Sequence, residues 1–310
     1  MSVLSYAPLL EVQLKSILVA TDLSQASEKA LCYAVSIARR YSSKIYLVNV
    51  VSSLGLTMAG PDAIVHASEI AEKEVAHVKE KLRRGGVLDG IEFEVVVREG
   101  EIWRELEKII RHERIELLVI GTHSRTGLAK LALGSVAERI FRNAHCPVLS
   151  IGASSIAETS SHSTDEARIL FPTDFGDRSL RPLPYALWLA RQLRARLVVY
   201  HALSRVFAPT DMMRHNMENG IDMHAEVKAA CLERLRSVIP ASFLEEEPIY
   251  EAEFGEPAEA ILQAAKKHNA KAIIMGLTHT RHVDALSHMP WTMTYNVVCG
   301  AECPVLTVRA

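Results

Sequence analysis

Residues 15–24 read "KSILVATDLS", and residues 167–176 read "ARILFPTDFG". In each stretch a short apolar run leads into the pair Thr-Asp, which is typical of a buried β-strand that ends in a polar turn. The two stretches lie about half a chain apart in a sequence of 310 residues, and their likeness indicates an internal repeat. The sequence therefore predicts one folding unit that occurs twice.

Three further pairs of segments recur in the same order along the chain. They are "IYLVNV" at 45–50 with "RLVVYHA" at 196–202, "REGEIWRELEKIIRHERIELLVIGTHS" at 98–124 with "EFGEPAEAILQAAKKHNAKAIIMGLTH" at 253–279, and "AHCPVLSI" at 144–151 with "AECPVLTV" at 301–308. The residues between the copies are small and polar, so they favour a linker over a packed element. We expect an N-terminal domain over residues 1–151, a linker over 152–166 and a C-terminal domain over 167–310.

Within each copy, short runs rich in β-branched residues alternate with longer segments of helical period. This alternation favours the α/β class, with an open parallel sheet covered by helices. In the first copy, the expected strands are residues 17–20, 45–50, 91–97, 117–120 and 148–151, and the expected helices are residues 27–41, 63–84, 102–112 and 135–142.

The segment "GTHSRTGLAKLALGSVAE" at 121–138 places small residues where the fourth expected strand gives way to a helix. In an open parallel sheet, ligands bind beyond the carboxyl ends of the strands, where the strand order reverses. Backbone N–H groups at a helix start favour an anion there, and Asp22 and Val50 can meet a ribose and a base. These features predict a nucleotide site whose phosphate-facing small residues are Gly121, Ser124, Gly127, Gly134 and Ser135.

A plainer explanation exists for two of these features. Thr21 and Asp22 can serve only to cap the helix that begins near Ser24, a role that short polar side chains often fill. The pair Gly134-Ser135 can likewise be no more than a helix start. The residues alone leave both explanations open.

The sequence resembles the universal stress protein family, in a tandem form with two such domains, over nearly the whole chain. The family's ATP-binding members carry an Asp after the first strand and G-x-x-G-x9-G-[ST] after the fourth, and here Asp22, Gly121, Ser124 and Gly134-Ser135 fall on those positions, with Ser124 in place of the second glycine. The resemblance implies five strands per domain in an adenine nucleotide alpha hydrolase-like fold. It also implies nucleotide contacts at Ala20, Thr21, Val50, Ile120, His123, Val136 and Ala137.

The second copy departs from the family's pattern in its fourth-strand loop. It keeps Thr173-Asp174 and Gly276, but alignment of the two Cys-Pro-Val segments places Trp291-Thr292 where the first copy has Gly-Ser. His279 replaces the other small residue. We therefore predict a degenerate second domain that does not hold ATP in the usual way.

Composition narrows the class of protein. A net charge of −2, from 35 basic and 37 acidic residues, gives no electrostatic reason to expect nucleic acid or an anionic membrane as a partner. We see no apolar run long enough to span a bilayer and expect a cytoplasmic protein. We expect reduced thiols at the five cysteines and no bound metal. A less favoured alternative is a metal site built from His201, His279, His282 and His288.

The sequence leaves three classes of function open. We favour a stress-response or regulatory module that binds ATP, ADP or AMP, with or without Mg²⁺, and that has an unknown protein partner. A weak ATP hydrolase is an alternative, although the loop lacks the lysine of a G-x-x-x-x-G-K-[ST] motif. A scaffold that needs no nucleotide is the other. By the resemblance, the two domains should pair through their last strands as an internal pseudo-dimer, and a homodimer is a further expectation.

Overall fold

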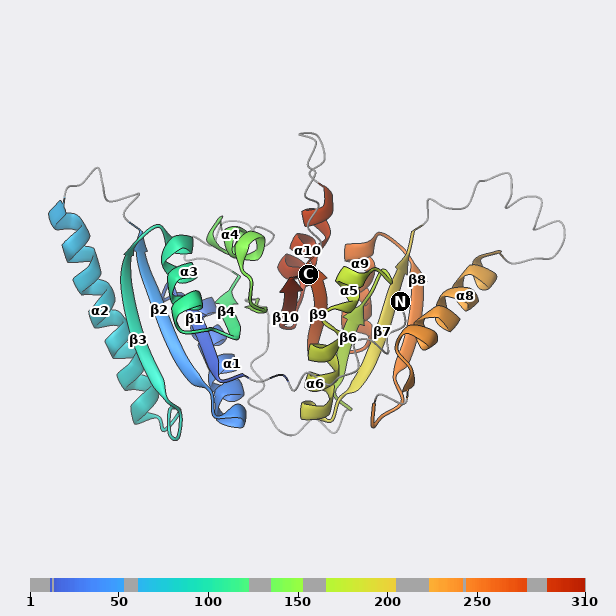
Figure 1. Ribbon diagram of the computed structural model, residues 1–310, viewed down its shortest axis with the longest axis horizontal. Helices are drawn as coiled ribbons and strands as arrows, with labels where there is room; N and C mark the ends of the chain where they lie inside the picture. The colour runs from blue at the N-terminus through green and yellow to red at the C-terminus, as the bar shows by residue number, and fades with distance from the viewer. Residues whose placement is uncertain are drawn as a thin grey trace. The chain divides into compact units, whose positions relative to one another are not determined.

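The computed structural model describes residues 12, 14–52, 61–122, 135–152, 166–204, 223–241, 244–277 and 289–309. The chain divides into two units, residues 13–159 and residues 160–310 together with 1–12, and each is described by itself. Each contains a five-stranded parallel sheet with helices packed on it (Figure 1). The predicted α/β class, with two repeated open sheets of five strands, is confirmed.

In the N-terminal unit the strand order is β3-β2-β1-β4-β5. The strands are β1 (Ser16–Ala20), β2 (Lys44–Ser52), β3 (Phe93–Gly100), β4 (Leu117–Gly121) and β5 (Val148–Ile151). Residues at the centre of β1 and β4 are fully buried, because helices cover both faces of a parallel sheet. The chain reaches β2 and β3 on one side of β1 and places β4 and β5 on the other, so the order reverses between β1 and β4.

Four helices cover this sheet: α1 (Gln25–Tyr41), α2 (Pro61–Arg84), α3 (Ile102–His112) and α4 (Ser135–Asn143). Right-handed crossovers place α1 and α2 on one face and α3 and α4 on the other, and α3 contacts α4. Figure 1 shows α2 beside β3 at the end of this unit. Ser24 caps α1 by accepting the N–H of Ser27, and Ser42 ends the helix in a left-handed conformation.

The helix and strand bounds of this unit lie within about two residues of the predicted segments, and the largest shift is at β3. The helix predicted over 102–112 and the strand predicted over 148–151 have those bounds in the structure. β3 begins at Phe93 rather than Ile91, because the backbone of Ile91 closes a turn onto Leu88. It continues to Gly100 rather than Val97, since its last residues pair with the end of β2.

The C-terminal unit has the strand order β10-β9-β6-β7-β8. Its strands are β6 (Arg168–Pro172), β7 (Arg196–Leu203), β8 (Ile249–Phe254), β9 (Ala272–Leu277) and β10 (Val305–Arg309). Its helices are α5 (Asp177–Leu180), α6 (Leu183–Leu193), α8 (Met223–Val238), α9 (Pro257–Lys267) and α10 (Met289–Gly300). Pro182 separates α5 from α6 in the place where the first copy has one helix, because proline has no N–H to continue the hydrogen-bond ladder.

The five cysteines all lie in the described part of the chain, and none of them forms a disulfide there. Burial raises the pKa of Cys146 to about 11 and that of Cys303 to about 12, because the apolar surroundings disfavour the thiolate. Both side chains pack just before their last strands. Among the described residues, no helix is both long and apolar enough to cross a membrane.

Candidate functional site

The candidate site lies at the carboxyl edge of the N-terminal sheet, where β1 and β4 run side by side. Ala20 is in register with Ile120, so the turn after β1 lies next to Gly121 at the end of β4. Ala20 and Gly121 are partly exposed, whereas the Ile120 side chain is buried in the core. A ligand at this edge would therefore reach Ile120 only through its backbone.

Thr21 organises the turn that follows β1. Its N–H donates to the carbonyl of Val48 (2.9 Å), and its Oγ1 accepts the N–H of Leu23 (3.0 Å) and donates to the hydroxyl of Ser27 (2.9 Å). Leu23 adopts a positive φ of 63° to close the turn. These contacts fix the backbone on either side of Asp22.

Asp22 has a local role that the sequence allowed as the plainer explanation. Its Oδ1 accepts the N–H of Ser24 at 3.0 Å, and Ser24 in turn caps α1. The carboxylate is exposed at the sheet edge, and its hydrogen bond within the described part of the chain uses one of its two oxygens. The helix-start role and a ligand role are therefore compatible.

Asn49 is a residue of this edge that the sequence reasoning missed. It is 8% exposed, and its Nδ2 donates to the carbonyl oxygen of Thr21 at 2.8 Å. The bond ties the end of β2 to the turn after β1 and leaves the neighbouring Val50 partly exposed at the same edge. The internal repeat could have indicated this position, because the polar residue His201 occupies the equivalent place in the second copy.

Gly121 has a packing role that is independent of any ligand. A Cβ atom at this position would lie 2.7 Å from the carbonyl carbon of Ala26 and 2.8 Å from the backbone nitrogen of Ser27. The first turn of α1 therefore needs glycine at the end of β4. A Cβ on Gly276 would likewise collide with the carbonyl oxygen of Arg178, which explains why both copies keep this glycine.

The phosphate-facing part of the predicted site is described only at its end. α4 begins at Ser135, with Val136 partly exposed and Ala137 buried in its first turn. This helix start lies at the carboxyl edge of the sheet, since β4 ends there. The other predicted residues of the loop, His123, Ser124, Gly127 and Gly134, lie outside the described residues, as does the side chain of Ser135.

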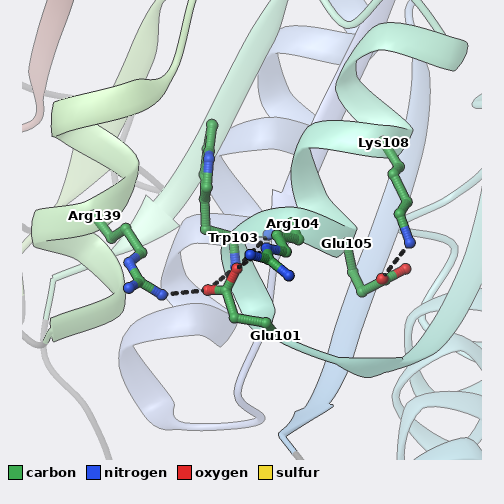
Figure 2. A network of polar contacts seen from close by, with 6 residues as sticks. All are labelled: Glu101, Trp103, Arg104, Glu105, Lys108 and Arg139. Carbon is green, nitrogen blue, oxygen red and sulfur yellow. Dashed lines mark hydrogen bonds and ion pairs between the residues drawn. The ribbon is translucent and has the colours of Figure 1, made fainter.

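A carboxylate at the start of α3 connects that helix to α4 (Figure 2). Glu101 accepts the N–H groups of Trp103 (3.1 Å) and Arg104 (3.0 Å), and Arg139 on α4 donates to its Oε1 at 2.5 Å. Burial would raise the pKa of Glu101, but the hydrogen bonds from Arg104, Arg139 and Trp103 outweigh it and lower the pKa. Sequence reasoning did not predict this pair, because its members lie 38 positions apart.

The C-terminal unit repeats the turn after the first strand. Thr173 accepts the N–H of Phe175 (3.0 Å), and the Oδ1 of Asp174 accepts the N–H of Gly176 (2.8 Å). Ser179 bonds to the hydroxyl of Thr173 at 2.9 Å, as Ser27 does to Thr21. The two turns therefore share most of their local framework, but the Oδ1 of Asp174 also accepts the hydroxyl of Ser179 at 2.5 Å.

His201 takes the place of Asn49 in this second framework. Its Nδ1 lies 2.7 Å from the carbonyl oxygen of Thr173, so this nitrogen carries the hydrogen. Its ring lies 4.6 Å from that of Phe175, whose other neighbour is the guanidinium of Arg234 at 4.2 Å. No group of three metal-ligating residues occurs in the described part of the chain, and the other histidines of the metal alternative, His279, His282 and His288, lie outside it.

Comparison with known proteins identifies the repeated unit. The universal stress protein family model matches residues 13–151 and again residues 167–309. A universal stress protein of Methanocaldococcus jannaschii is 33% identical over 138 residues, which cover 44% of this chain and 80% of that protein. Universal stress protein YxiE of Bacillus subtilis is 27% identical over 140 residues, which cover 43% of this chain and 95% of that protein.

A solved structure shares the fold over both units. The crystal structure of a universal stress protein from Archaeoglobus fulgidus covers 96% of this chain and 97% of its own, with a TM-score of 0.69 and 23% identity. The resemblance drawn from the Thr-Asp turns and the glycine loop is therefore confirmed. With two family matches that span nearly its whole length, the chain belongs to the universal stress protein family in its tandem form.

Proposed function

We propose that the N-terminal domain binds an adenine nucleotide, and that the chain acts as a nucleotide-dependent regulatory module in a stress response. The observation that carries the proposal is the adjacency of β1 and β4 at the point where the strand order reverses. This adjacency brings Asp22, Gly121 and the start of α4 to one edge of the sheet. Ligands of open parallel sheets bind at such a point.

The residues at this edge suit the parts of a nucleotide. The exposed carboxylate of Asp22 can accept hydrogen bonds from a ribose hydroxyl or the adenine amine, and the partly exposed Val50 can offer an apolar surface to the base. The free N–H groups at the start of α4 favour the phosphates, with the Gly134-Ser135 pair supplying close backbone approach and a hydroxyl. ATP, ADP and AMP all have this chemistry.

We further propose that nucleotide binds at about one site per chain. The C-terminal domain has the same Thr-Asp turn, but its sequence places Trp291 where the N-terminal domain has Gly134. An indole at that position would take the volume that phosphate oxygens need. Each lost hydrogen bond to a charged phosphate costs about 1.5–3 kcal/mol, which is roughly tenfold or more in affinity.

The test is calorimetric titration of the full chain with ATP, together with analysis of any nucleotide retained on the purified protein. We expect saturation near one equivalent and loss of binding in Gly134→Trp, since the bulky side chain would fill the phosphate position. Two equivalent sites, or unchanged affinity in Gly134→Trp, would contradict the assignment. A turnover assay on the same samples separates a binding module from an ATP hydrolase.

A further inference from the structure

We infer that Glu101 and Arg139 are positioning residues for the nucleotide site, because they fix the first turns of α4 against α3. The inference rests on the proposed function, since α4 is the helix whose start would meet the phosphates. Both residues lie on the same side of the sheet, and Figure 2 shows their side chains extended toward each other from the two helices.

Glu101 is placed where it can act as a fixed anchor. It follows β3 directly and is the N-cap of α3, so it stands at the carboxyl edge of the sheet, like Asp22 and Gly121. Its two oxygens accept N–H groups from the first turn of α3, in addition to the bond from Arg139. The carboxylate is therefore held by its own helix and cannot follow α4 if that helix moves.

Arg139 connects the fixed carboxylate of Glu101 to α4. It lies in the second turn of α4, which begins at Ser135. Ile140 and Phe141 hold α4 on the sheet by burial, whereas the bond to Glu101 fixes its rotation and its height along the sheet edge.

The second copy supplies an internal comparison. Glu256 occupies the position of Glu101 as the N-cap of α9, but its side chain makes no capping hydrogen bond with that helix. Alignment of the Cys-Pro-Val segments places the exposed Asn296 where the first copy has Arg139. The pair is thus present in the copy that keeps Gly134-Ser135 and is not kept in the copy that has Trp291-Thr292.

The direction in which Glu101→Gln changes the affinity for ATP distinguishes a positioning role from a simple electrostatic effect. Glu101 is an anion near the place of an anionic ligand, so a purely Coulombic effect predicts tighter ATP binding in Glu101→Gln. If Arg139 instead contacted a phosphate itself, Glu101→Gln would release it and would again strengthen binding or leave it unchanged. Positioning predicts weaker binding, because the charged bond that holds α4 is lost.

The experiment measures ATP and AMP affinity of the full chain and of Glu101→Gln, Arg139→Met, Arg139→Lys and the Glu101→Gln/Arg139→Met double variant. We expect each of the first two changes to weaken ATP binding about fivefold, the size of a coupling energy of roughly 1 kcal/mol. The double variant should bind no more weakly than Arg139→Met. AMP should lose less affinity than ATP, since fewer phosphates reach α4, and Arg139→Lys should recover part of the loss.

Two variants make the same charge changes on the same helices without touching the link between them. Arg142→Met removes an arginine that pairs with Glu138 within α4 at 2.7 Å, and Glu107→Gln removes a carboxylate that pairs with Arg111 within α3 at 2.8 Å. Arg139 and Arg142 have similar exposure, 57% and 54% of their side chains. We expect ATP affinity close to that of the parent chain in both controls.

Three results would overturn the inference while leaving the proposed function in place. They are ATP affinity that is unchanged or higher in Glu101→Gln, an equal loss for ATP and AMP in Arg139→Met, and an equal loss in Arg142→Met. Each of these results overturns the inference alone when the parent chain binds ATP and the Gly134→Trp variant does not. A parent chain that binds no adenine nucleotide would instead overturn the proposed function and the inference together.

Discussion

The Nδ2 amide of Asn49 donates a 2.8 Å hydrogen bond to the carbonyl oxygen of Thr21, from the end of β2 to the turn after β1. Asn49 is buried, so Asn49→Ala should lower the free energy of unfolding by about 1–3 kcal/mol, the cost of a lost buried hydrogen bond. Asn49→His should retain more stability, because His201 makes the equivalent contact in the second copy.

Urea unfolding followed by Trp103 fluorescence measures this effect in a chain with Trp188→Phe and Trp291→Phe. Trp103 then reports the N-terminal domain alone, since the chain has three tryptophans. A loss of less than about 0.5 kcal/mol in Asn49→Ala, the size of an ordinary surface effect, would show that the bond adds little to the turn.

Gly121 and Gly276 should tolerate no side chain, because a Cβ at either position would meet the backbone of α1 or α5, respectively. Gly121→Ala should cost about 1–3 kcal/mol of stability through overpacking, and Gly276→Ala should cost more, since its contact would be closer. Gly85→Ala is the matched control, because its Cβ would make only ordinary contacts of 3.5 Å. Equal urea midpoints for all three variants would refute the packing role.

Asp22→Ala and Asp174→Ala separate the helix-start role of these carboxylates from ligand binding. Each carboxylate accepts an N–H two residues ahead, at 3.0 and 2.8 Å, and Asp174 also accepts the Ser179 hydroxyl at 2.5 Å, so Asp174→Ala should cost its domain more stability than Asp22→Ala costs the other. The proposed site predicts that Asp22→Ala weakens ATP binding at least about tenfold, because the change removes a hydrogen bond between a charged carboxylate and a polar group of the nucleotide. Asp174→Ala should leave the titration unchanged, and the reverse pattern would move the site to the other domain.

The stability of the C-terminal domain should depend on pH through Glu251, which bonds His268 at 2.6 Å and Lys267 at 2.9 Å. Burial would raise the pKa of Glu251, but the hydrogen bonds from Lys267 and His268 outweigh it and lower the pKa below its ordinary value of 4.5. A lowered pKa stabilises the folded state above pH 4.5, and this contribution is lost as the pH falls through the lower, folded-state value.

Glu251→Gln should therefore destabilise the C-terminal domain at neutral pH by about 1–3 kcal/mol, and its stability should converge with that of the parent chain in acid. Urea unfolding followed by Trp188 fluorescence, with Trp103 and Trp291 replaced by Phe, measures both. Glu253→Gln is the control on the same strand, because its pair with Lys228 is more exposed and worth less. If the free energy of unfolding of Glu251→Gln differed from that of the parent chain by the same amount at all pH values, the proposed pH dependence through Glu251 would be contradicted.

The fold could be predicted from the sequence because its signals are local and occur twice. Apolar runs such as residues 117–120 and 148–151 must be buried on both faces, and the amphipathic segment over residues 102–112 can only be a surface helix. The bounds of β3 could not be predicted, because an edge strand continues for as long as its neighbour offers backbone partners. The shared Thr-Asp turn and the glycine loop likewise indicated the family from the residues alone.

The roles within the site depended on contacts between distant parts of the chain. Sequence assigned Gly121 to a phosphate loop, whereas the structure adds a contact with α1 that requires glycine for steric reasons. Asn49 and Thr21 lie 28 positions apart, and Glu101 and Arg139 lie 38 apart, so no local pattern reveals either bond. The sequence determined which segments form strands and helices, because backbone propensity and burial act over a few residues. The tertiary structure decided which polar groups meet, because a hydrogen bond depends on distances that only the packed sheet and helices set.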